Sequence, residues 1–314
     1  MSEVAFGGRC RRTANTERSV NMADDPVLGS ERTGGDEQRL KDQKEKVRVF
    51  RKRLHARDTF ILPEVWDVVS ARVMGDAGFT LIGISAKAVA WAQGLKRDER
   101  LTLDTLTGTA QAIARGFAIP VMADLEGIVG RRAEEVGAAA ESVIAEGCAG
   151  VVFSDGGRDG RDGIAPVKDM VAALQAVKAA ALRTKVPAVI IARTEAFLLD
   201  PPQSSPFETA VERAEAYFAA GADAISVPGV QHIQLIERLA AHIDGPLCVT
   251  IGLTPAPSVK DFKGAGAACV ALGPALLRSL LGTLRHNAEE LLAFGQFNNI
   301  SKAIPEDALN ELLR

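Results

Sequence analysis

Apolar runs with β-strand composition alternate with alanine-rich helical segments along most of this 314-residue chain, and this alternation limits the possible folds most strongly. Eight runs are candidate strands: residues 59–62, 80–85, 119–124, 150–153, 188–192, 224–227, 247–250 and 268–272. The runs are apolar throughout, which is typical of parallel strands that are buried on both faces of a sheet. Eight strand–helix units in succession therefore predict an α/β fold of the (β/α)8 TIM-barrel type.

A doubly wound open sheet is the alternative arrangement of such units. It is disfavoured because no glycine-rich phosphate-binding sequence follows the first strand. Residues 274–314 continue beyond the eighth strand as helical sequence, so the barrel is expected to have extended C-terminal helices. The barrel and this extension together are predicted to occupy residues 44–314.

The first 43 residues differ in composition from the rest of the chain. They are polar, glycine-rich and charged, without apolar periodicity, which predicts a disordered N-terminal tail. They also lack the apolar core of a secretory signal peptide. We interpret them as a plain tail; alternatively, Met22 is the true start and the first 21 residues lie upstream of it. An organellar transit peptide is a further alternative.

The composition also limits the kinds of partner. The formal net charge is −3 at pH 7, which does not point to nucleic acid or an anionic membrane surface. No apolar run reaches the roughly 18–20 residues that a membrane span needs. The four cysteines lack the paired spacing of a metal site. These features predict a cytoplasmic protein without nucleic-acid or membrane partners.

Two carboxylates end the third candidate strand, within the sequence Pro-Val-Met-Ala-Asp-Leu-Glu-Gly at residues 120–127. Asp124 and Glu126 are two positions apart, so in a strand their side chains lie on the same face. Converging carboxylates repel each other unless a cation or a proton lies between them. Mg²⁺ fits such a pair, because it needs few protein carboxylates and keeps several waters. The alternative is a strand that runs out into a solvated acidic turn.

Polar residues follow most of the other candidate strands as well. In a barrel the chemistry belongs to the C-terminal strand ends, which share one rim. The residues at these ends are Ser85, Asp124, Glu126, Ser154, Asp155, Arg193, Thr194, Glu195, Pro228, Thr250 and Gly273. Acids, one arginine and small hydroxyls on one rim predict a site that holds a cation and an anionic substrate together.

Several motifs, in a fixed order between about residue 50 and residue 292, resemble the isocitrate lyase/phosphoenolpyruvate mutase superfamily. They are Leu-Pro-Glu-Val-Trp-Asp at 62–67, Ser-Ala-Arg at 70–72, Ala-Gly-Phe at 77–79, residues 120–130, Ile-Ile-Ala-Arg-Thr-Glu-Ala at 190–196, residues 212–224 and Gly-Pro-Ala-Leu-Leu-Arg at 273–278. The resemblance implies a (β/α)8 barrel whose last helix is exchanged between subunits, giving a homodimer or homotetramer. The helical sequence at 274–314 fits such swapped helices.

The same resemblance implies a Mg²⁺ site, with Mn²⁺ as an alternative ion. Asp124 matches the direct ligand, and Glu126 matches a ligand that acts through water. Asp98 is the counterpart of a further family acid, with a solvated turn residue as an equal alternative. The resemblance also implies enolate chemistry, in which the cation stabilises negative charge as a C–C or P–C bond breaks.

Substrate-binding residues are implied in the same way. Ser85 and Ala86 match a pair that grips a substrate carboxylate, and Arg193 matches an arginine that anchors a carboxylate or phosphonate. A guanidinium suits either group, because it donates two parallel hydrogen bonds. The alternative for Arg193 is an ion pair with an acid of the rim. Thr250 stands where the family has asparagine, and it completes the predicted substrate-binding set.

The chain departs from the family at positions that choose the reaction. Ser154 replaces the glutamate of a Glu-Asp pair, and Pro228 replaces a glutamate after the sixth strand. The loop at 155–163 lacks the Lys-Cys-Gly-His type of sequence found in isocitrate and methylisocitrate lyases. A standard lyase of either kind is therefore excluded. Asp155, Glu195 and Lys87 remain as candidates for the general acid or base.

We therefore predict a Mg²⁺-dependent C–C lyase that acts on a small 2-oxo or hydroxy carboxylate through an enolate. Its predicted catalytic residues are Arg193, Asp155, Lys87 and Glu195. One alternative is P–C bond chemistry of the phosphoenolpyruvate mutase or phosphonopyruvate hydrolase type, on a phosphonate substrate. Another is a barrel that binds carboxylates without catalysis.

Overall fold

A computed structural model of the chain describes residues 27–56, 58–96, 99, 101–127, 132–156, 163–199, 205–252, 256–296, 298 and 300–314, with side chains from residue 35 onward. The chain divides into two compact units, residues 1–39 and residues 40–314. The first helix, α1 (Val27–Leu54), begins in the first unit and continues into the second. The region predicted to be a disordered tail up to residue 43 therefore contains the beginning of a helix.

Two factors stabilise helix α1: the helix propensity of its residues, and the burial of its apolar residues in the core. Residues 37–46 are mostly glutamate, glutamine, lysine and arginine, which favour helix on an exposed surface. Val47, Phe50 and Leu54 then recur at helical spacing and are buried in the core of the second unit. Apolar periodicity is clear only from Val47 onward, so before that residue helix propensity is the only local signal.

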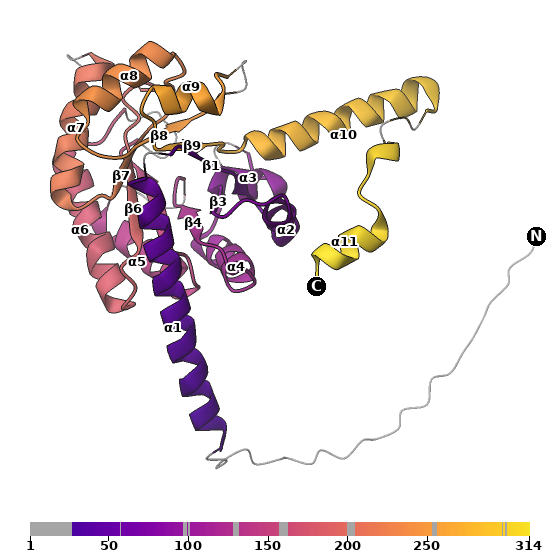
Figure 1. The fold of residues 1–314 in the computed structure, drawn as a ribbon, viewed down its shortest axis with the longest axis horizontal. Helices are drawn as coiled ribbons and strands as arrows, with labels where there is room; N and C mark the ends of the chain where they lie inside the picture. The colour runs from indigo at the N-terminus through magenta and orange to yellow at the C-terminus, as the bar shows by residue number, and fades with distance from the viewer. Residues whose placement is uncertain are drawn as a thin grey trace, which may run out of the picture. The chain divides into compact units, whose positions relative to one another are not determined.

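Nine parallel strands in the described part of the chain form one nearly closed barrel, in the spatial order β1-β9-β8-β7-β6-β5-β4-β3-β2 (Figure 1). The strands are β1 (Phe60–Leu62), β2 (Glu64–Val65), β3 (Ile82–Ile84), β4 (Val121–Asp124), β5 (Gly150–Ser154), β6 (Val189–Arg193), β7 (Ala224–Val227), β8 (Leu247–Thr250) and β9 (Cys269–Ala271). Each of the eight predicted runs contains a strand, and β2 directly follows the first of them. The predicted α/β TIM-like barrel is therefore confirmed.

Pro63 separates β1 from β2 at the closure of the barrel. β1 pairs with β9, which places Leu62 opposite Ala271, and β2 pairs with β3, which places Glu64 opposite Gly83. Proline has no N–H to donate to a sheet, but the Pro63 carbonyl accepts a hydrogen bond from the Gly83 N–H at 2.9 Å. A single extended segment thus joins the two ends of the sheet.

Helices cover the outer side of the barrel (Figure 1). They are α2 (Val68–Asp76), α3 (Ala86–Ala92), α4 (Leu103–Ala114), α5 (Ala133–Ala145), α6 (Val167–Arg183), α7 (Pro206–Ala220), α8 (Ile233–His242) and α9 (Val259–Gly264). Polar side chains of Asp67, Thr102, Ser205 and Ser258 accept hydrogen bonds from the first turns of four of these helices. Buried alanines on the inward helix faces allow close packing on the strands.

Three more elements follow β9: α10 (Ala275–Phe294), the 3₁₀ helix η1 (Ile300–Lys302) and α11 (Glu306–Leu312). α10 runs outward from the barrel (Figure 1). Leu277 at its start is buried, whereas Leu280, Leu281 and Leu284 are exposed by 45–61%. The predicted C-terminal helical extension is therefore present. Within the described residues, no helix combines the length and the apolar character that crossing a membrane would require.

Candidate active site at the barrel rim

Three neighbouring strand ends bring acidic, hydroxyl and guanidinium groups together. Asp124 is the last residue of β4, Ser154 the last of β5 and Arg193 the last of β6. In the parallel register Asp124 lies opposite Val152, and Ser154 lies opposite Arg193. The preceding strand residues are apolar and buried, so the polar groups begin only at the rim.

Arg193 lies between the two carboxylates of the predicted metal site. Its Nη2 donates to Asp124 Oδ2 at 2.9 Å, and its Nη1 donates to Glu126 Oε2 at 2.6 Å. The side chains of Arg193 and Asp124 are only 10% and 8% exposed. Lys87 of α3, half-exposed, approaches Glu126 Oε1 at 3.4 Å. The structure thus contains the ion pair with rim acids that was the alternative interpretation of Arg193.

The charges of this cluster shift each other's pKa values. Burial alone would lower the pKa of Arg193, but Asp124 and Glu126 outweigh burial and raise it, so the guanidinium stays charged. Burial raises the pKa of Asp124, although the nearby Arg193 opposes this shift. Burial also acts to raise the pKa of Glu126, but Arg193 and Lys87 lower it overall. Glu126 is therefore the more readily ionised acid of the pair.

Glu64 of β2 is a buried acid of this rim that the sequence analysis did not single out. Its side chain is almost fully buried, and its Oε2 accepts a hydrogen bond from the Gly273 N–H. Burial, together with repulsion from Asp124, raises the pKa of Glu64 to about 7. A Cβ at residue 83 would lie 2.8 Å from Glu64 Cγ, so Gly83 makes room for the acid. The sequence does contain a sign of this role, because a charged residue so close to an apolar strand is rarely buried unless it has a specific function.

Glu64→Gln is expected to stabilise the metal-free protein more at pH 8 than at pH 5. The folded protein keeps the Glu64 proton up to a pKa of about 7, whereas an unfolded glutamate loses it near 4.5. The stability of the wild type therefore falls as the pH rises through this window, by about 3 kcal/mol at most. The neutral amide avoids this loss and still accepts the Gly273 hydrogen bond. Urea unfolding in EDTA at both pH values measures the effect, and a pH-independent difference from wild type would contradict it.

Glu195 turns back toward the end of β5. The Ser154 hydroxyl donates to Glu195 Oε1 at 2.9 Å and accepts from the Gly156 N–H at 2.9 Å. A Cβ at residue 156 would lie 2.7 Å from Glu195 Cγ, so this position needs glycine. Burial raises the pKa of Glu195, and Arg193 only partly offsets the shift. Glu195 therefore holds a proton to a higher pH than an ordinary glutamate, which favours a role as general acid.

Asp155 is buried in a cluster formed with α7. Its Oδ2 accepts from Arg213 Nη1 at 2.9 Å and from the Tyr217 hydroxyl at 2.8 Å, and its Oδ1 accepts from the Glu195 N–H at 2.9 Å. Arg213 Nη2 also donates to the Ala165 carbonyl at 2.7 Å. The Asp155 side chain has no exposed surface. Its oxygens therefore bind the protein's own groups, and they fix the backbone of Glu195 and the chain around Ala165.

The predicted substrate-binding residues Ser85, Ala86 and Thr250 lie at the same end of the barrel. Ser85 and Ala86 are buried at the start of α3, where Ser85 Oγ caps the helix by accepting a backbone N–H at 3.2 Å. Thr250 is half-buried at the end of β8. A Cβ at Gly273 would lie 3.6 Å from Thr250 Cγ2 and 3.9 Å from Glu64 Oε2. Gly273 thus brings Thr250 and Glu64 into one part of the rim.

Two parts of the predicted site lie outside the described residues. One is Asp98, the predicted third acid of the metal site. The other is the middle of the glycine-rich loop, residues 157–162, with its arginines and aspartates. The described ends of this loop pair with each other through a bridge between Gly156 and Ile164.

The donor chemistry of the rim fits a hard divalent cation. Four carboxyl groups act electrostatically on the Arg193 guanidinium: those of Glu64, Asp124, Glu126 and Glu195. Acids therefore outnumber the cationic groups Arg193 and Lys87, and a divalent cation would favour the ionised forms of the acids whose pKa values burial raises. Among the described residues no three acidic, histidine or cysteine side chains are arranged as a ligand set. Mg²⁺ suits such a sparse set, because one or two carboxylates are enough when water completes the shell.

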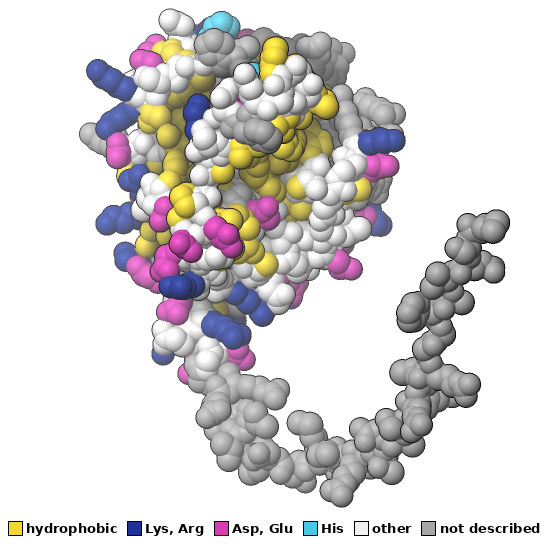
Figure 2. Space-filling model, turned by 90° about the vertical axis from the view of Figure 1, so that its right-hand side faces the viewer, with side chains coloured by type: hydrophobic (Ala, Val, Ile, Leu, Met, Phe, Trp, Pro, Cys, Tyr) yellow, Lys and Arg dark blue, Asp and Glu magenta, His cyan; other side chains and the backbone are white. Residues whose placement is uncertain are grey.

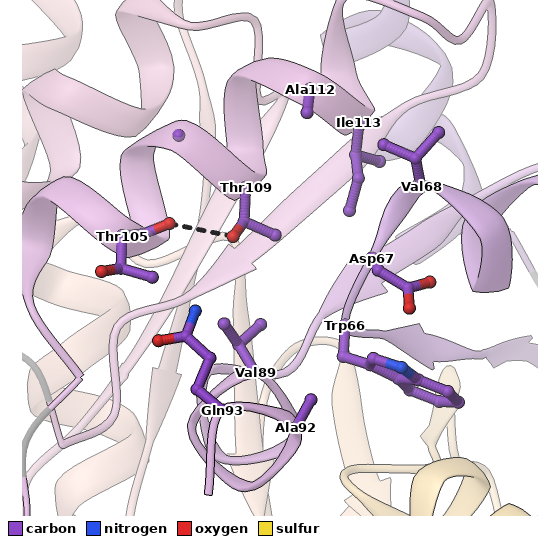
Figure 3. A pocket seen from close by; sticks show the side chains of 11 residues that line it. Trp66, Asp67, Val68, Val89, Ala92, Gln93, Thr105, Thr109, Ala112 and Ile113 are labelled. Atoms are coloured by element: carbon purple, nitrogen blue, oxygen red, sulfur yellow. Dashed lines mark hydrogen bonds between the residues drawn. The ribbon is translucent and has the colours of Figure 1, made fainter. Parts of the chain in front are cut away.

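A separate hollow of about 490 Å³ lies outside the rim, between α2, α3 and α4 (Figure 3). Trp66 and Val89 contribute apolar surface to it. The Thr109 hydroxyl donates to the Thr105 carbonyl at 2.9 Å, and the Asp67 carboxylate caps α2. The Thr109 and Asp67 side chains thus serve the local helices, and the Gln93 amide also lines the hollow (Figure 3). The rim is therefore the candidate active site.

The sequence matches the family model for phosphoenolpyruvate phosphomutase over residues 50–292. An oxaloacetate decarboxylase of Chromohalobacter salexigens is 34% identical over 223 residues, which cover 68% of this chain and 72% of the relative. A 2-methylisocitrate lyase of Bacillus subtilis is 27% identical over 234 residues, which cover 71% of this chain and 74% of the relative. The structure of a phosphoenolpyruvate phosphomutase from Streptomyces platensis subsp. rosaceus matches with a TM-score of 0.73 and 25% identity, over 85% of this chain and 94% of that one.

Proposed function

Because this chain belongs to the isocitrate lyase/phosphoenolpyruvate mutase superfamily, we propose that it is a Mg²⁺-dependent lyase that breaks a C–C bond in a small 2-oxo or hydroxy carboxylate through an enolate. The observation that carries the proposal is the Arg193 guanidinium held between Asp124 and Glu126 at the strand ends. The relatives named as a decarboxylase and a lyase support the reaction class. Oxaloacetate is therefore the first substrate to test.

Asp124 and Glu126 are the residues that would hold the cation. Mg²⁺, or Mn²⁺ in its place, supplies a Lewis acid that stabilises the negative charge of an enolate. Arg193 would bind the substrate carboxylate by releasing one rim carboxylate, because the Nη groups that donate to Asp124 and Glu126 can donate to substrate oxygens instead. Ser85 after β3 and Thr250 at the end of β8, on separate parts of the rim, complete the orientation of a small anion.

We assign the proton transfer to Glu195. It lies directly after the Arg193–Thr194 pair, it is held by the Ser154 hydroxyl, and burial raises its pKa. Lys87 is half-exposed and bound to Glu126, so it serves better to balance charge than to transfer a proton. Asp155 acts as a positioning residue, since each of its oxygens already accepts a hydrogen bond from the protein.

Turnover of oxaloacetate tests this function directly. We expect pyruvate formation that requires Mg²⁺, stops in EDTA and falls at least about a hundredfold in Asp124→Asn. Free Mg²⁺ decarboxylates oxaloacetate slowly by itself, so the Asp124→Asn protein at equal metal concentration is the control. A thermal-shift screen over 2-oxo acids, hydroxy acids and phosphonates extends the search to other substrates. Absence of both turnover and Mg²⁺-dependent stabilisation across this set would exclude the proposal.

Chemistry at a P–C bond is a second candidate, favoured by the match to the phosphoenolpyruvate phosphomutase family over most of the chain. The Arg193 fork would hold a phosphonate as well as a carboxylate. Phosphorus NMR after incubation with phosphonopyruvate separates the cases. Inorganic phosphate indicates hydrolysis, phosphoenolpyruvate indicates mutation, and unchanged substrate favours C–C cleavage.

A barrel that binds carboxylates without catalysis is the remaining alternative, motivated by Ser154 and Pro228 in place of family acids. It predicts that a carboxylate raises the melting temperature while no product forms. The acid count of the rim argues for catalysis instead, because Glu64 and Glu195 add two buried carboxyl groups beside Arg193.

We also propose that α10 joins two copies of this chain in a dimer or tetramer. Its exposed leucines Leu280, Leu281 and Leu284 form an apolar stripe at helical spacing. Figure 2 faces the side from which α10 projects and shows hydrophobic side chains gathered at its centre. Burial of this stripe against a second copy would remove apolar surface from water.

The double variant Leu280→Glu/Leu284→Glu is therefore expected to be monomeric. Two buried carboxylates without partners would oppose association strongly. Light scattering after gel filtration at micromolar concentration measures the mass. His286→Glu, an exposed position on the same helix, serves as the control and should leave the oligomer intact. A wild-type protein that is itself monomeric would refute the role of α10.

A further inference from the structure

A hollow of about 360 Å³ lies at the opposite end of the barrel from the rim, which we call the basal pocket. Its lining includes Arg51, Lys178, Leu182, Lys185, Pro187 and Asp223. Pro187 comes shortly before β6 and Asp223 directly before β7, so the pocket lies at the N-terminal strand ends. Catalytic residues of barrels lie at the other end. A ligand here would therefore not compete with a substrate at the rim.

The single acid among these lining residues is already neutralised. Arg51 Nε donates to Asp223 Oδ1 at 2.7 Å, and Arg51 Nη2 donates to the Pro187 carbonyl at 2.9 Å. Asp223 Oδ2 also accepts the Ile190 N–H at 2.9 Å. Arg51 and Asp223 thus build the wall of the pocket.

Two lysines of the pocket have no acidic partner among the residues that the structure describes. Lys178 of α6 folds over Gly221, because a Cβ at that residue would lie 2.5 Å from Lys178 Nζ. Gly221 has φ 102°, so glycine is required there for its backbone as well. The Lys178 ammonium therefore lies beside Gly221 at the pocket, while the residue as a whole stays exposed to solvent.

Lys185 has an unusual backbone conformation for its residue type. Its φ is 59°, and in the described chain the other positive φ angles belong to glycines. It follows the end of α6, where the Val186 N–H donates to the Ala181 carbonyl at 3.1 Å and glycine is normally preferred. A lysine at this position costs stability in its backbone, although its positive charge suits the negative end of the helix dipole. A strained residue that lines a pocket suggests a role in binding.

The surroundings of the basal pocket are also basic. An adjoining hollow of about 490 Å³ shares Arg51 and Pro187 with it. The remaining side chains of that hollow are Lys44, Val47, Arg48, Lys52 and His55. Arg48 pairs with Glu45 and Arg51 with Asp223, so the lysines that line the two hollows supply the positive charge that remains at this end. Such a field attracts anions and raises their local concentration.

We propose that the basal pocket binds a small phosphomonoester, with its phosphate at Lys178 and Lys185 and its apolar body against Leu182. Two ammonium groups without acidic partners suit a dianion, and lysine binds phosphate as a point charge. Leu182 is 79% exposed, and it offers apolar surface beside the charges. The volume lies at the lower end of the range for small-molecule pockets, which limits the ligand to a small one.

Isothermal titration calorimetry with phenyl phosphate at low ionic strength tests the proposal. We expect saturable binding that weakens about tenfold in Lys178→Gln and in Lys185→Gly, because each variant removes one charge-assisted contact. Lys260→Gln, an exposed lysine on α9, is the matched control and should bind as wild type does. Inorganic phosphate should bind more weakly than phenyl phosphate, since it lacks the apolar body.

Lys185→Gly also tests whether weaker binding in a lysine variant is caused by misfolding. Glycine adopts positive φ freely, so this variant should melt about 2 °C higher than wild type while its phosphate binding weakens. Turnover at the rim should be unchanged, which separates this test from that of the proposed lyase function. Absence of saturable phenyl phosphate binding, or binding that both lysine variants retain, would overturn the proposal.

Discussion

Arg193→Gln is expected to lower kcat/KM by about 10²- to 10³-fold. The guanidinium is nearly buried and bonds to Asp124 and Glu126 at once, so its loss removes the substrate anchor and the counter-ion of both acids. Steady-state turnover of oxaloacetate measures the effect on activity. Urea unfolding of the same variant measures the cost of leaving two carboxylates without their cation.

Arg193→Lys separates charge from geometry. Lysine restores the positive charge but cannot donate two parallel hydrogen bonds to a carboxylate. We expect stability to recover in part while kcat/KM stays at least tenfold below wild type. Full activity in Arg193→Lys would show that charge alone matters, and full activity in Arg193→Gln would remove Arg193 from the mechanism.

Arg213→Met is expected to lower the free energy of unfolding by about 3–5 kcal/mol, the usual cost of breaking a buried ion pair from one side. The Arg213 side chain is 9% exposed and its partner Asp155 is not exposed at all. Methionine fills a similar volume but leaves the Asp155 carboxylate buried without its cation. Chemical denaturation followed by circular dichroism gives the difference from wild type.

Tyr217→Phe is the matched control for the Asp155 cluster. It removes the hydrogen bond that the hydroxyl donates to Asp155 Oδ2 and the one that it accepts from Arg213 Nη1. It keeps the ring and the Arg213–Asp155 ion pair, so it should cost about 1–3 kcal/mol. Because Asp155 positions the Glu195 backbone, the Arg213 variant should also lower kcat more than KM changes. An Arg213→Met protein within 1 kcal/mol of wild type would mean that the cluster does not stabilise the rim.

The barrel and the line of strand-end residues were predictable because both depend on local signals. Continuous apolar runs mark buried parallel strands, and the polar residues that follow them lie on one edge whatever the details of packing. This reasoning placed Asp124, Ser154 and Arg193 at neighbouring strand ends, as the structure has them. The ion pair between Arg193 and Asp124 was foreseen only as an alternative, because spacing cannot show which groups bond.

The residues that were missed act through tertiary contacts. Arg213 and Tyr217 lie one helical turn apart on α7, and their buried side chains meet Asp155 across more than fifty positions of sequence. Two polar residues at i and i+4 beside the buried Ala210 and Ala214 were a usable sign that α7 presents them inward. Glu64 was missed because its role depends on the closure at Pro63.

The closure of the barrel at Pro63 also determines at which stage of folding the rim can form. The segment from β1 to β2 pairs with β3 nearby and with β9, whose residues lie more than two hundred positions away in the chain. Contacts of such separation carry the largest loop entropy and belong to the slow steps of folding. Glu64 and its Gly273 partner meet only across this seam. A partly folded chain, with the seam still open, therefore has no complete acid cluster, and ligand binding reports on the last stage of barrel assembly.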